Sequence, residues 1–167
     1  VAHLVLINTF AWPLQGHLAV RLPGLVLGSA LGRCLYARLN LSPRFIGPGA
    51  WADRSKLSPE LLSQHLAPTE PVHVRTEVLW ALARALLASR NHYAGIEARL
   101  DRLRDTPVSL VWGTKDPAFP EPFLRGFQER IPHARVVRVD DAGHWPHEES
   151  PAAVLQALGY SSPPSGS

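Results

Sequence analysis

The chain has 167 residues, of which 46% are hydrophobic and 19% are charged, a composition typical of a globular protein rather than a disordered one. Its 17 Lys and Arg and 14 Asp and Glu give a net charge of +3, and the cations are scattered along the chain, so nucleic-acid binding is not expected. No apolar stretch approaches the ~20 residues of a membrane-spanning helix, and the first apolar run is too short for a signal peptide, so we expect neither. Cys34 is the single cysteine, which excludes an intrachain disulfide and a cysteine cluster for metal; we expect a cytoplasmic protein.

Three short apolar runs rich in β-branched residues predict buried strands over residues 4–8, 108–112 and 135–139. Their apolarity is continuous rather than alternating, which is typical of a parallel sheet that is covered on both faces. A helix predicted over residues 121–130 connects the second strand to the third. This arrangement is a β-α-β unit, for which a right-handed crossover is expected.

The long segment between the first two strands has a helical character. Ser58 is placed to cap a helix predicted over residues 57–66. Apolar residues at every fourth position predict a second, amphipathic helix over residues 74–90. An earlier apolar helix is expected to carry three glycines on one face, where they would let a neighbouring element approach closely: Gly24, Gly28 and Gly32.

These elements divide the chain into four parts. We expect residues 1–9 to form a strand of the core, residues 10–104 a helical cap, and residues 105–160 the C-terminal β-α-β-α part of the core. The tail, residues 161–167, is polar and turn-rich, and we expect it to be disordered. A helical insertion between two strands of a parallel sheet is typical of a cap over an active site.

Two titratable side chains follow neighbouring strands of the predicted sheet. Asp116 follows the second strand in W-G-T-K-D-P, and His144 follows the third in D-D-A-G-H-W-P. Because ligands bind beyond the carboxyl ends of parallel strands, both side chains are expected at the same edge. A carboxylate beside an imidazole is the orienting half of a nucleophile–His–acid triad. The acid fixes the tautomer, and the imidazole takes a proton from a nucleophile or from water.

Other interpretations of these two residues remain open at this point. Asp116 could simply cap the helix that follows it, and His144 could be an ordinary turn histidine. Asp140 and Asp141 compete with Asp116 for the role of the acid, although their position suits the turn before His144 better.

A metal site is not expected near His144. Three further candidate ligands follow it closely in the sequence: His147, Glu148 and Glu149. No second cluster of ligands accompanies them, so we interpret them as solvated residues at the start of a helix.

Two aromatic residues just after the first strand are candidates for the substrate pocket. Phe10 and Trp12 are expected to enter the roof of that pocket, and packing in the core is the alternative for each.

The two motifs identify a family. VSLVWGTKDPAFP followed by DAGHWPHEESP resembles the C-terminal part of an α/β-hydrolase. With the leading LVLINTFAWP and the cap-like DRSKLSPE, the sequence is most similar to the haloalkane-dehalogenase branch, over residues 1–158. The resemblance implies an α/β fold, namely the C-terminal portion of the α/β-hydrolase fold with a helical cap inserted after the first strand. It also implies that Asp116 is the acid, that His144 is the base, and that no metal or organic cofactor is needed.

Some relatives carry the acid after the first strand. This sequence has Asn8 and Thr9 at that place and no carboxylate nearby, which favours Asp116.

The nucleophile is where the sequence departs from the family. In this fold it stands on a G-x-[SD]-x-G elbow, but the two G-x-x-x-G matches here have Val26 and Ala30 at the middle position. The sequence also contains no Met and opens within an apolar run. We therefore expect a fragment whose nucleophile lies in a missing N-terminal half of the same protein.

The expected function is hydrolysis of a small molecule through a covalent ester. By resemblance, an upstream Asp would displace halide from a haloalkane, and His144, held by Asp116, would activate water. The alternatives are an epoxide hydrolase, in which Tyr36 and Tyr93 would polarise the epoxide oxygen, a serine esterase, and a truncated or degenerate hydrolase that only binds a partner. The fragment alone is expected to be inactive, and its partners are the substrate, water and the missing half.

Overall fold

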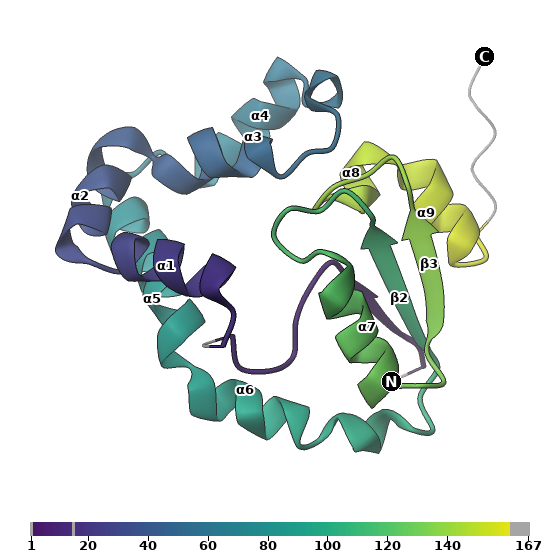
Figure 1. Ribbon diagram of the computed structural model, residues 1–167. Coiled ribbons are helices and arrows are strands. Elements are labelled where there is room, and N and C mark those ends of the chain that lie inside the picture. Colours follow the sequence, from purple (N-terminus) through teal and green to yellow (C-terminus); the bar gives the residue numbers. More distant parts are fainter. Residues whose placement is uncertain (1, 15, 161–167) are drawn as a thin grey trace, which may run out of the picture. The chain divides into compact units, whose positions relative to one another are not determined.

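The computed structural model describes residues 2–14 and 16–160 of the chain (Figure 1). The tail over residues 161–167, for which disorder was expected, lies outside the described residues. The chain divides into two compact units, and we call them the core unit and the helical unit. The core unit comprises the described residues of Val1–Phe10, Ala50–Lys56 and Arg99–Ser167, and the helical unit comprises those of Ala11–Gly49 and Leu57–Ala98.

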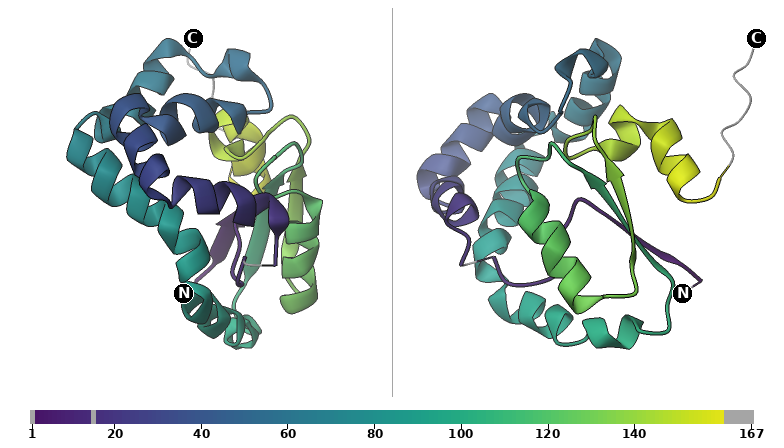
Figure 2. Two further views of the ribbon diagram at one scale, coloured as in Figure 1. Left: turned by 60° about the vertical axis from the view of Figure 1, so that its left-hand side comes forward. Right: turned by 45° about the vertical axis from the view of Figure 1, so that its right-hand side comes forward.

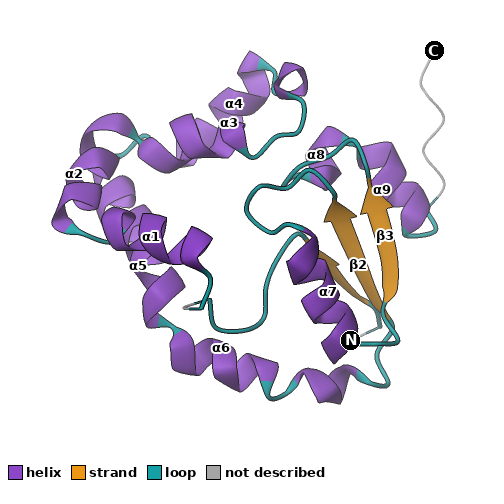
Figure 3. Cartoon of the chain, viewed as in Figure 1, coloured by secondary structure: helices purple, strands orange, loops and turns teal. Residues whose placement is uncertain are grey.

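The core unit is built on a parallel sheet of three strands, shown in orange in Figure 3. The strands lie in the order β1-β2-β3 and span Leu4–Ile7, Val108–Gly113 and Arg135–Val139. The register pairs Leu110 of β2 with Leu6 on one side and with Val136 on the other. These bounds lie within one residue of those that the apolar runs predict, so the three strands and their parallel arrangement are confirmed.

Helices cover both faces of this sheet. They are α7 (Glu121–Arg130), α8 (Pro146–Glu149) and α9 (Pro151–Ala157). Figure 2 shows α7 on one side of the strands and α8 and α9 on the other. Trp112 packs against Phe127 of α7, whereas its neighbour Val111 belongs to a buried cluster with Val154 of α9. Since successive side chains of a strand point to opposite faces, this alternation places apolar partners on both sides of β2.

The burial of the three strands differs. Every residue of β2 is buried, as its continuous apolarity predicts. All four residues of β1 are only partly buried, and β3 has exposed residues at Arg135 and Arg138. The reason is their place in the sheet, because β1 and β3 form its two edges among the described strands.

The helical unit lies between β1 and β2 in the chain. Its α-helices are α1 (Leu18–Leu27), α2 (Ala30–Leu39), α3 (Gly47–Gly49), α4 (Pro59–Leu66), α5 (Trp80–Ala88) and α6 (Arg90–Glu97). Shorter π- and 3-10-helical segments span Ser42–Ile46, Arg54–Lys56, Ala67–Thr69, Val74–Leu79 and Leu100–Leu103, of which the second and the last belong to the core unit. The hydroxyl of Ser58 accepts a hydrogen bond from the N–H of Leu61, so the predicted cap of α4 is confirmed.

The prediction of one apolar helix carrying three glycines on a single face is wrong. The chain ends α1 and begins α2 with Ser29 as the N-cap, whose hydroxyl accepts a hydrogen bond from the N–H of Gly32. Gly24 nevertheless permits a close approach, because a Cβ there would lie 3.0 Å from the side chain of Leu87 in α5. A capping serine in the middle of an apolar run therefore outweighs the apolar periodicity.

Candidate active site

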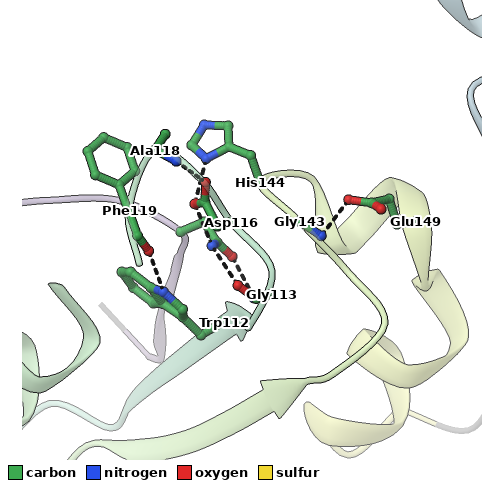
Figure 4. Close-up of polar contacts among 9 residues, drawn as sticks. Trp112, Gly113, Asp116, Ala118, Phe119, Gly143, His144 and Glu149 are labelled. Carbon is green, nitrogen blue, oxygen red and sulfur yellow. Dashed lines mark hydrogen bonds and ion pairs between the residues drawn. The ribbon is translucent and has the colours of Figure 1, made fainter. Parts of the chain in front are cut away.

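Two loops at the carboxyl ends of β2 and β3 bring Asp116 and His144 together (Figure 4). Oδ2 of Asp116 lies 2.8 Å from Nδ1 of His144. The carboxylate is completely buried, whereas 21% of the His144 side chain is exposed. Because an ionised carboxylate only accepts hydrogen bonds, the proton of a neutral His144 lies on Nδ1. Its Nε2 then carries the free lone pair, which is what a general base requires.

A tight turn after β2 fixes the orientation of Asp116. Its other oxygen, Oδ1, accepts a hydrogen bond of 2.7 Å from the N–H of Ala118. This side-chain-to-backbone bond is the usual way in which Asp stabilises a turn. Gly113 allows the neighbouring loop to come close, since a Cβ at that position would collide with the carbonyl oxygen of Gly143. The two loops therefore meet backbone to backbone.

Asn8 also contacts Asp116, a role that its place in the sequence did not predict. Its Nδ2 donates to Oδ2 of Asp116 at 2.7 Å and to the carbonyl of Gly113 at 3.3 Å. Its Oδ1 accepts a hydrogen bond of 2.8 Å from the N–H of Gly113. Asn8 has φ +31°, a left-handed conformation that Asn adopts more readily than most residues. A polar residue at the end of an apolar strand, on the edge where the site was expected, was the signal available in the sequence.

The charge of Asp116 follows from these contacts. Burial by itself raises the pKa of this carboxyl. The hydrogen bond and the charge of His144, together with the N–H of Ala118 and the amide of Asn8, outweigh burial and lower the pKa below the usual value for Asp. Asp116 is therefore ionised at neutral pH and able to accept the Nδ1 proton.

Aromatic rings surround the imidazole of His144. The ring centroid of Phe119 lies 5.5 Å from that of His144, and Trp145 approaches edge-on at 4.8 Å. The Nε1 of Trp112 donates a hydrogen bond of 2.8 Å to the carbonyl of Phe119, as Figure 4 shows. This hydrogen bond ties the backbone of Phe119, whose ring lies beside the imidazole, to the fully buried central strand β2.

The two residues predicted to line the pocket lie in different units. The ring of Phe10 packs at 5.3 Å from Phe119, so Phe10 joins the aromatic group beside His144. Trp12 belongs to the helical unit, where it is buried. The structure therefore brings Phe10 together with the candidate pair through Phe119.

The competing acids lie at the surface. Asp140 and Asp141 are both exposed, and Asp141 forms an ion pair of 3.6 Å with Lys115. Of these three carboxylates, Asp116 contacts His144.

The interpretation of residues 147–149 as solvated is wrong for one of them. Nε2 of His147 lies 3.9 Å from Oε1 of Glu148 near the surface. Glu149 is only 4% exposed, and its carboxylate accepts hydrogen bonds from backbone N–H groups. Among the residues that the structure describes, no three His, Cys, Asp or Glu side chains are grouped so that they could hold a metal ion. Within the same residues, no helix is both long enough and apolar enough to cross a bilayer.

Comparison with known proteins shows which family the chain matches. The model described as the alpha/beta hydrolase family matches residues 1–157. A cis-3-alkyl-4-alkyloxetan-2-one decarboxylase of Xanthomonas campestris pv. campestris is 34% identical over 59 residues, which make up 35% of this chain and 20% of that protein.

Solved structures share the fold. The haloalkane dehalogenase DbeA from Bradyrhizobium elkani covers 95% of this chain with a TM-score of 0.73 and 20% identity. A variant of an epoxide hydrolase from Bacillus megaterium also covers 95%, with a TM-score of 0.62 and 19% identity. The chain spans 57% of the first of these chains and 60% of the second. The resemblance that the two motifs indicate is therefore confirmed at the level of the fold and the family.

Proposed function

Because the chain belongs to the alpha/beta hydrolase family, we propose that it carries the acid and the base of a catalytic triad, Asp116 and His144. The observation that carries the proposal is the 2.8 Å contact between the buried Oδ2 of Asp116 and Nδ1 of His144. In this arrangement the acid holds the imidazole in one tautomer and stabilises the imidazolium that forms during the reaction. The Nε2 of His144 then takes a proton from water.

In this proposal the nucleophile comes from residues outside the 167-residue sequence. Neither G-x-x-x-G match in the chain has Ser or Asp at its centre, the position that an elbow nucleophile occupies. An Asp at that position attacks the carbon of a haloalkane, so that a carbon–oxygen bond forms and halide leaves. The product of this step is an alkyl ester of the enzyme.

His144 acts in the second step. Its Nε2 removes a proton from water, and the resulting hydroxide attacks the carbonyl carbon of the ester. The bond between this carbonyl carbon and the alkoxy oxygen breaks, the alcohol leaves with the proton that His144 returns, and the carboxylate nucleophile is restored. Asp116 stays ionised throughout, because its lowered pKa keeps it so at neutral pH.

The walls of the site support a small, uncharged substrate. Phe119 and Trp145 place their rings beside the imidazole, Phe10 packs on Phe119, and each of these three residues is partly buried. Such walls offer a charged group no replacement for the water that it loses on binding, whereas an alkyl chain gains from the contact. A haloalkane satisfies this requirement.

Alternative substrates use the same pair. An epoxide is opened by a carboxylate nucleophile to give the same type of ester, and a serine esterase uses His144 first to deprotonate the serine. The Xanthomonas relative is named for an oxetan-2-one, which adds a strained lactone to the candidate substrates. A chain that only binds a partner is the alternative without catalysis.

The test uses the protein expressed from the whole reading frame in which this sequence is encoded. We expect halide release over many turnovers from short chloroalkanes and bromoalkanes, and loss of turnover beyond the first in His144→Phe. Asp141→Asn is the matched control, because it changes an exposed carboxylate three residues before the imidazole. If the protein converts an epoxide, a p-nitrophenyl ester or a dialkyl oxetan-2-one and no haloalkane, the proposed substrate class is wrong and the converted compound replaces it. A folded protein that converts none of the four would overturn the proposal.

A further inference from the structure

Glu149 is a buried carboxylate that takes no part in the proposed reaction. It is the last residue of α8, and both oxygens of its carboxylate accept hydrogen bonds. Oε1 accepts a hydrogen bond of 2.7 Å from the N–H of Gly143, which Figure 4 shows. Oε2 accepts from the N–H groups of Ala52 and Asp53, at 2.8 and 3.3 Å. Glu149 therefore joins two backbone segments that are far apart in the sequence.

One of these segments carries the candidate base. Gly143 directly precedes His144, and the N–H of His144 itself donates a hydrogen bond of 2.8 Å to the carbonyl of Ala50. A side chain at position 143 would collide with this same carbonyl and would lie 2.8 Å from the N–H nitrogen of Ala52. The glycine thus permits the close approach of the segment Ala50–Lys56, and Glu149 holds the two segments together.

The nature of the partners makes this contact rigid. A buried carboxylate is costly unless hydrogen bonds replace its water, and three N–H donors supply them here. A lysine side chain is flexible and could keep its bond to a carboxylate that moves. A backbone N–H can move only together with its loop, so these bonds fix the loops relative to Glu149. Lys56, the nearby cation of the same segment, donates to the backbone carbonyl of Glu149 at 3.1 Å. Bonds to charged acceptors are also about twice as strong as neutral ones.

We propose that Glu149 is a positioning residue that holds the His144 loop on the segment Ala50–Lys56, and so keeps Nδ1 of His144 within hydrogen-bonding distance of Asp116. The inference rests on the proposed function in one respect, the assignment of His144 as the base. Glutamine cannot replace the carboxylate in this role. An amide accepts at one oxygen only, and its NH₂ would face N–H donors on the other side.

The experiment compares Glu149→Gln with Glu148→Gln in the protein from the whole reading frame. Glu148→Gln is the matched control, because it removes the same charge one residue away. Histidine labelled with ¹⁵N reports the tautomer and the titration of His144, which is identified from its missing signal in His144→Gln. We expect the Nδ1–H tautomer in the wild type and in Glu148→Gln, and a mixture of tautomers in Glu149→Gln. If the protein turns over substrate, kcat should fall by about 10²-fold in Glu149→Gln with little change in KM.

Each outcome separates this inference from the proposed function. A Glu149→Gln protein that melts earlier, yet keeps the wild-type tautomer and titration of His144, would show a purely structural role and overturn the inference. A wild type that lacks the Nδ1–H tautomer would overturn the pair of Asp116 and His144 itself. If Glu149→Gln does not fold, hydrogen exchange of the unaltered protein decides. The amides of Gly143 and Ala52 are expected to exchange slowly, and rapid exchange would contradict the proposed role of Glu149.

Discussion

The amide Nδ2 of Asn8 lies 2.7 Å from Oδ2 of Asp116, the same oxygen that faces the imidazole of His144. The amide therefore holds Asp116 from the end of the first strand through Oδ2, whereas the tight turn after β2 holds Oδ1. Some relatives in the family that the motifs resemble carry the acid at the end of this strand. Here it supplies a hydrogen-bond donor to Asp116, the proposed acid, which follows the neighbouring strand.

The role of Asn8 can be tested by unfolding. Asn8→Ala leaves the N–H of Gly113 and one lone pair of Asp116 without their amide partner, which is expected to cost about 1–3 kcal/mol of unfolding free energy. The left-handed φ of this position adds a strain of about 1–2 kcal/mol with alanine. Asn8→Gly is the matched control, because it removes the amide but not the conformational freedom. Urea unfolding should rank the wild type above Asn8→Gly and that variant above Asn8→Ala. Equal stability of all three would contradict the contacts described for Asn8.

The role of Asp116 is tested by an isosteric change. Asp116→Asn is expected to keep the fold and to lower kcat by about 10⁴, as replacement of a triad acid by its amide does when the wrong imidazole tautomer results. Steady-state kinetics on the protein from the whole reading frame measures this effect. Asp140→Asn and Asp141→Asn are the controls, since both carboxylates are exposed. Near-normal turnover in Asp116→Asn, with loss in either control, would move the acid role to another residue.

The lowered pKa of Asp116 predicts how stability depends on pH. A carboxyl whose pKa is lower in the folded state than in the unfolded state stabilises the fold above its unfolded pKa of about 3.9. This stabilising contribution is lost as the pH falls through the pKa of Asp116 in the folded state. Asp116→Asn has no such group, so the difference in unfolding free energy between wild type and variant should narrow below about pH 4. Urea unfolding at a series of pH values between neutral and acidic measures it. A difference that stays constant, or widens in acid, would contradict the lowered pKa.

The role of His144 predicts a trapped intermediate. If the nucleophile is an Asp, His144→Phe should still form the ester, because attack by a carboxylate requires no deprotonation. Hydrolysis should stop, since no base remains to activate water. Mass spectrometry after incubation with a haloalkane should then show the protein with the mass of the alkyl group added. Unchanged multiple turnover would remove His144 from the mechanism.

The chain of residues 1–167 on its own is predicted to be inactive and poorly soluble or loosely packed. Both outer strands of its described sheet are edges, and an apolar edge is a template for aggregation. Seven large apolar residues in the described part of the helical unit are each more than half exposed: Leu22, Leu25, Val26, Leu31, Phe45, Val72 and Leu82. Size-exclusion chromatography, thermal unfolding and assays with haloalkanes, epoxides and p-nitrophenyl esters measure these properties. A cooperative melt of this chain, with turnover that His144→Ala abolishes, would contradict the prediction.

The sequence by itself determined the strands and the candidate pair. Each strand is an apolar run with a turn after it. Both signals are local, so they can be recognised without knowing which segments pack against the strand. Asp116 and His144 could be placed at one edge because parallel strands present their carboxyl ends together. The helix over Glu121–Arg130 was predictable for the same reason, since its pattern is complete within its own residues.

Only the tertiary structure decided what supports that pair. Asn8 contacts Asp116 across 108 residues of sequence, and Glu149 contacts Ala52 across 97. From its polar surroundings in the sequence, Glu149 is predicted to be solvated. It is buried because the segment that contains Ala52 and Asp53 packs against it. The hydrogen bonds that hold a buried polar group depend on which segments pack together, and local periodicity carries no information about a partner so distant in the chain.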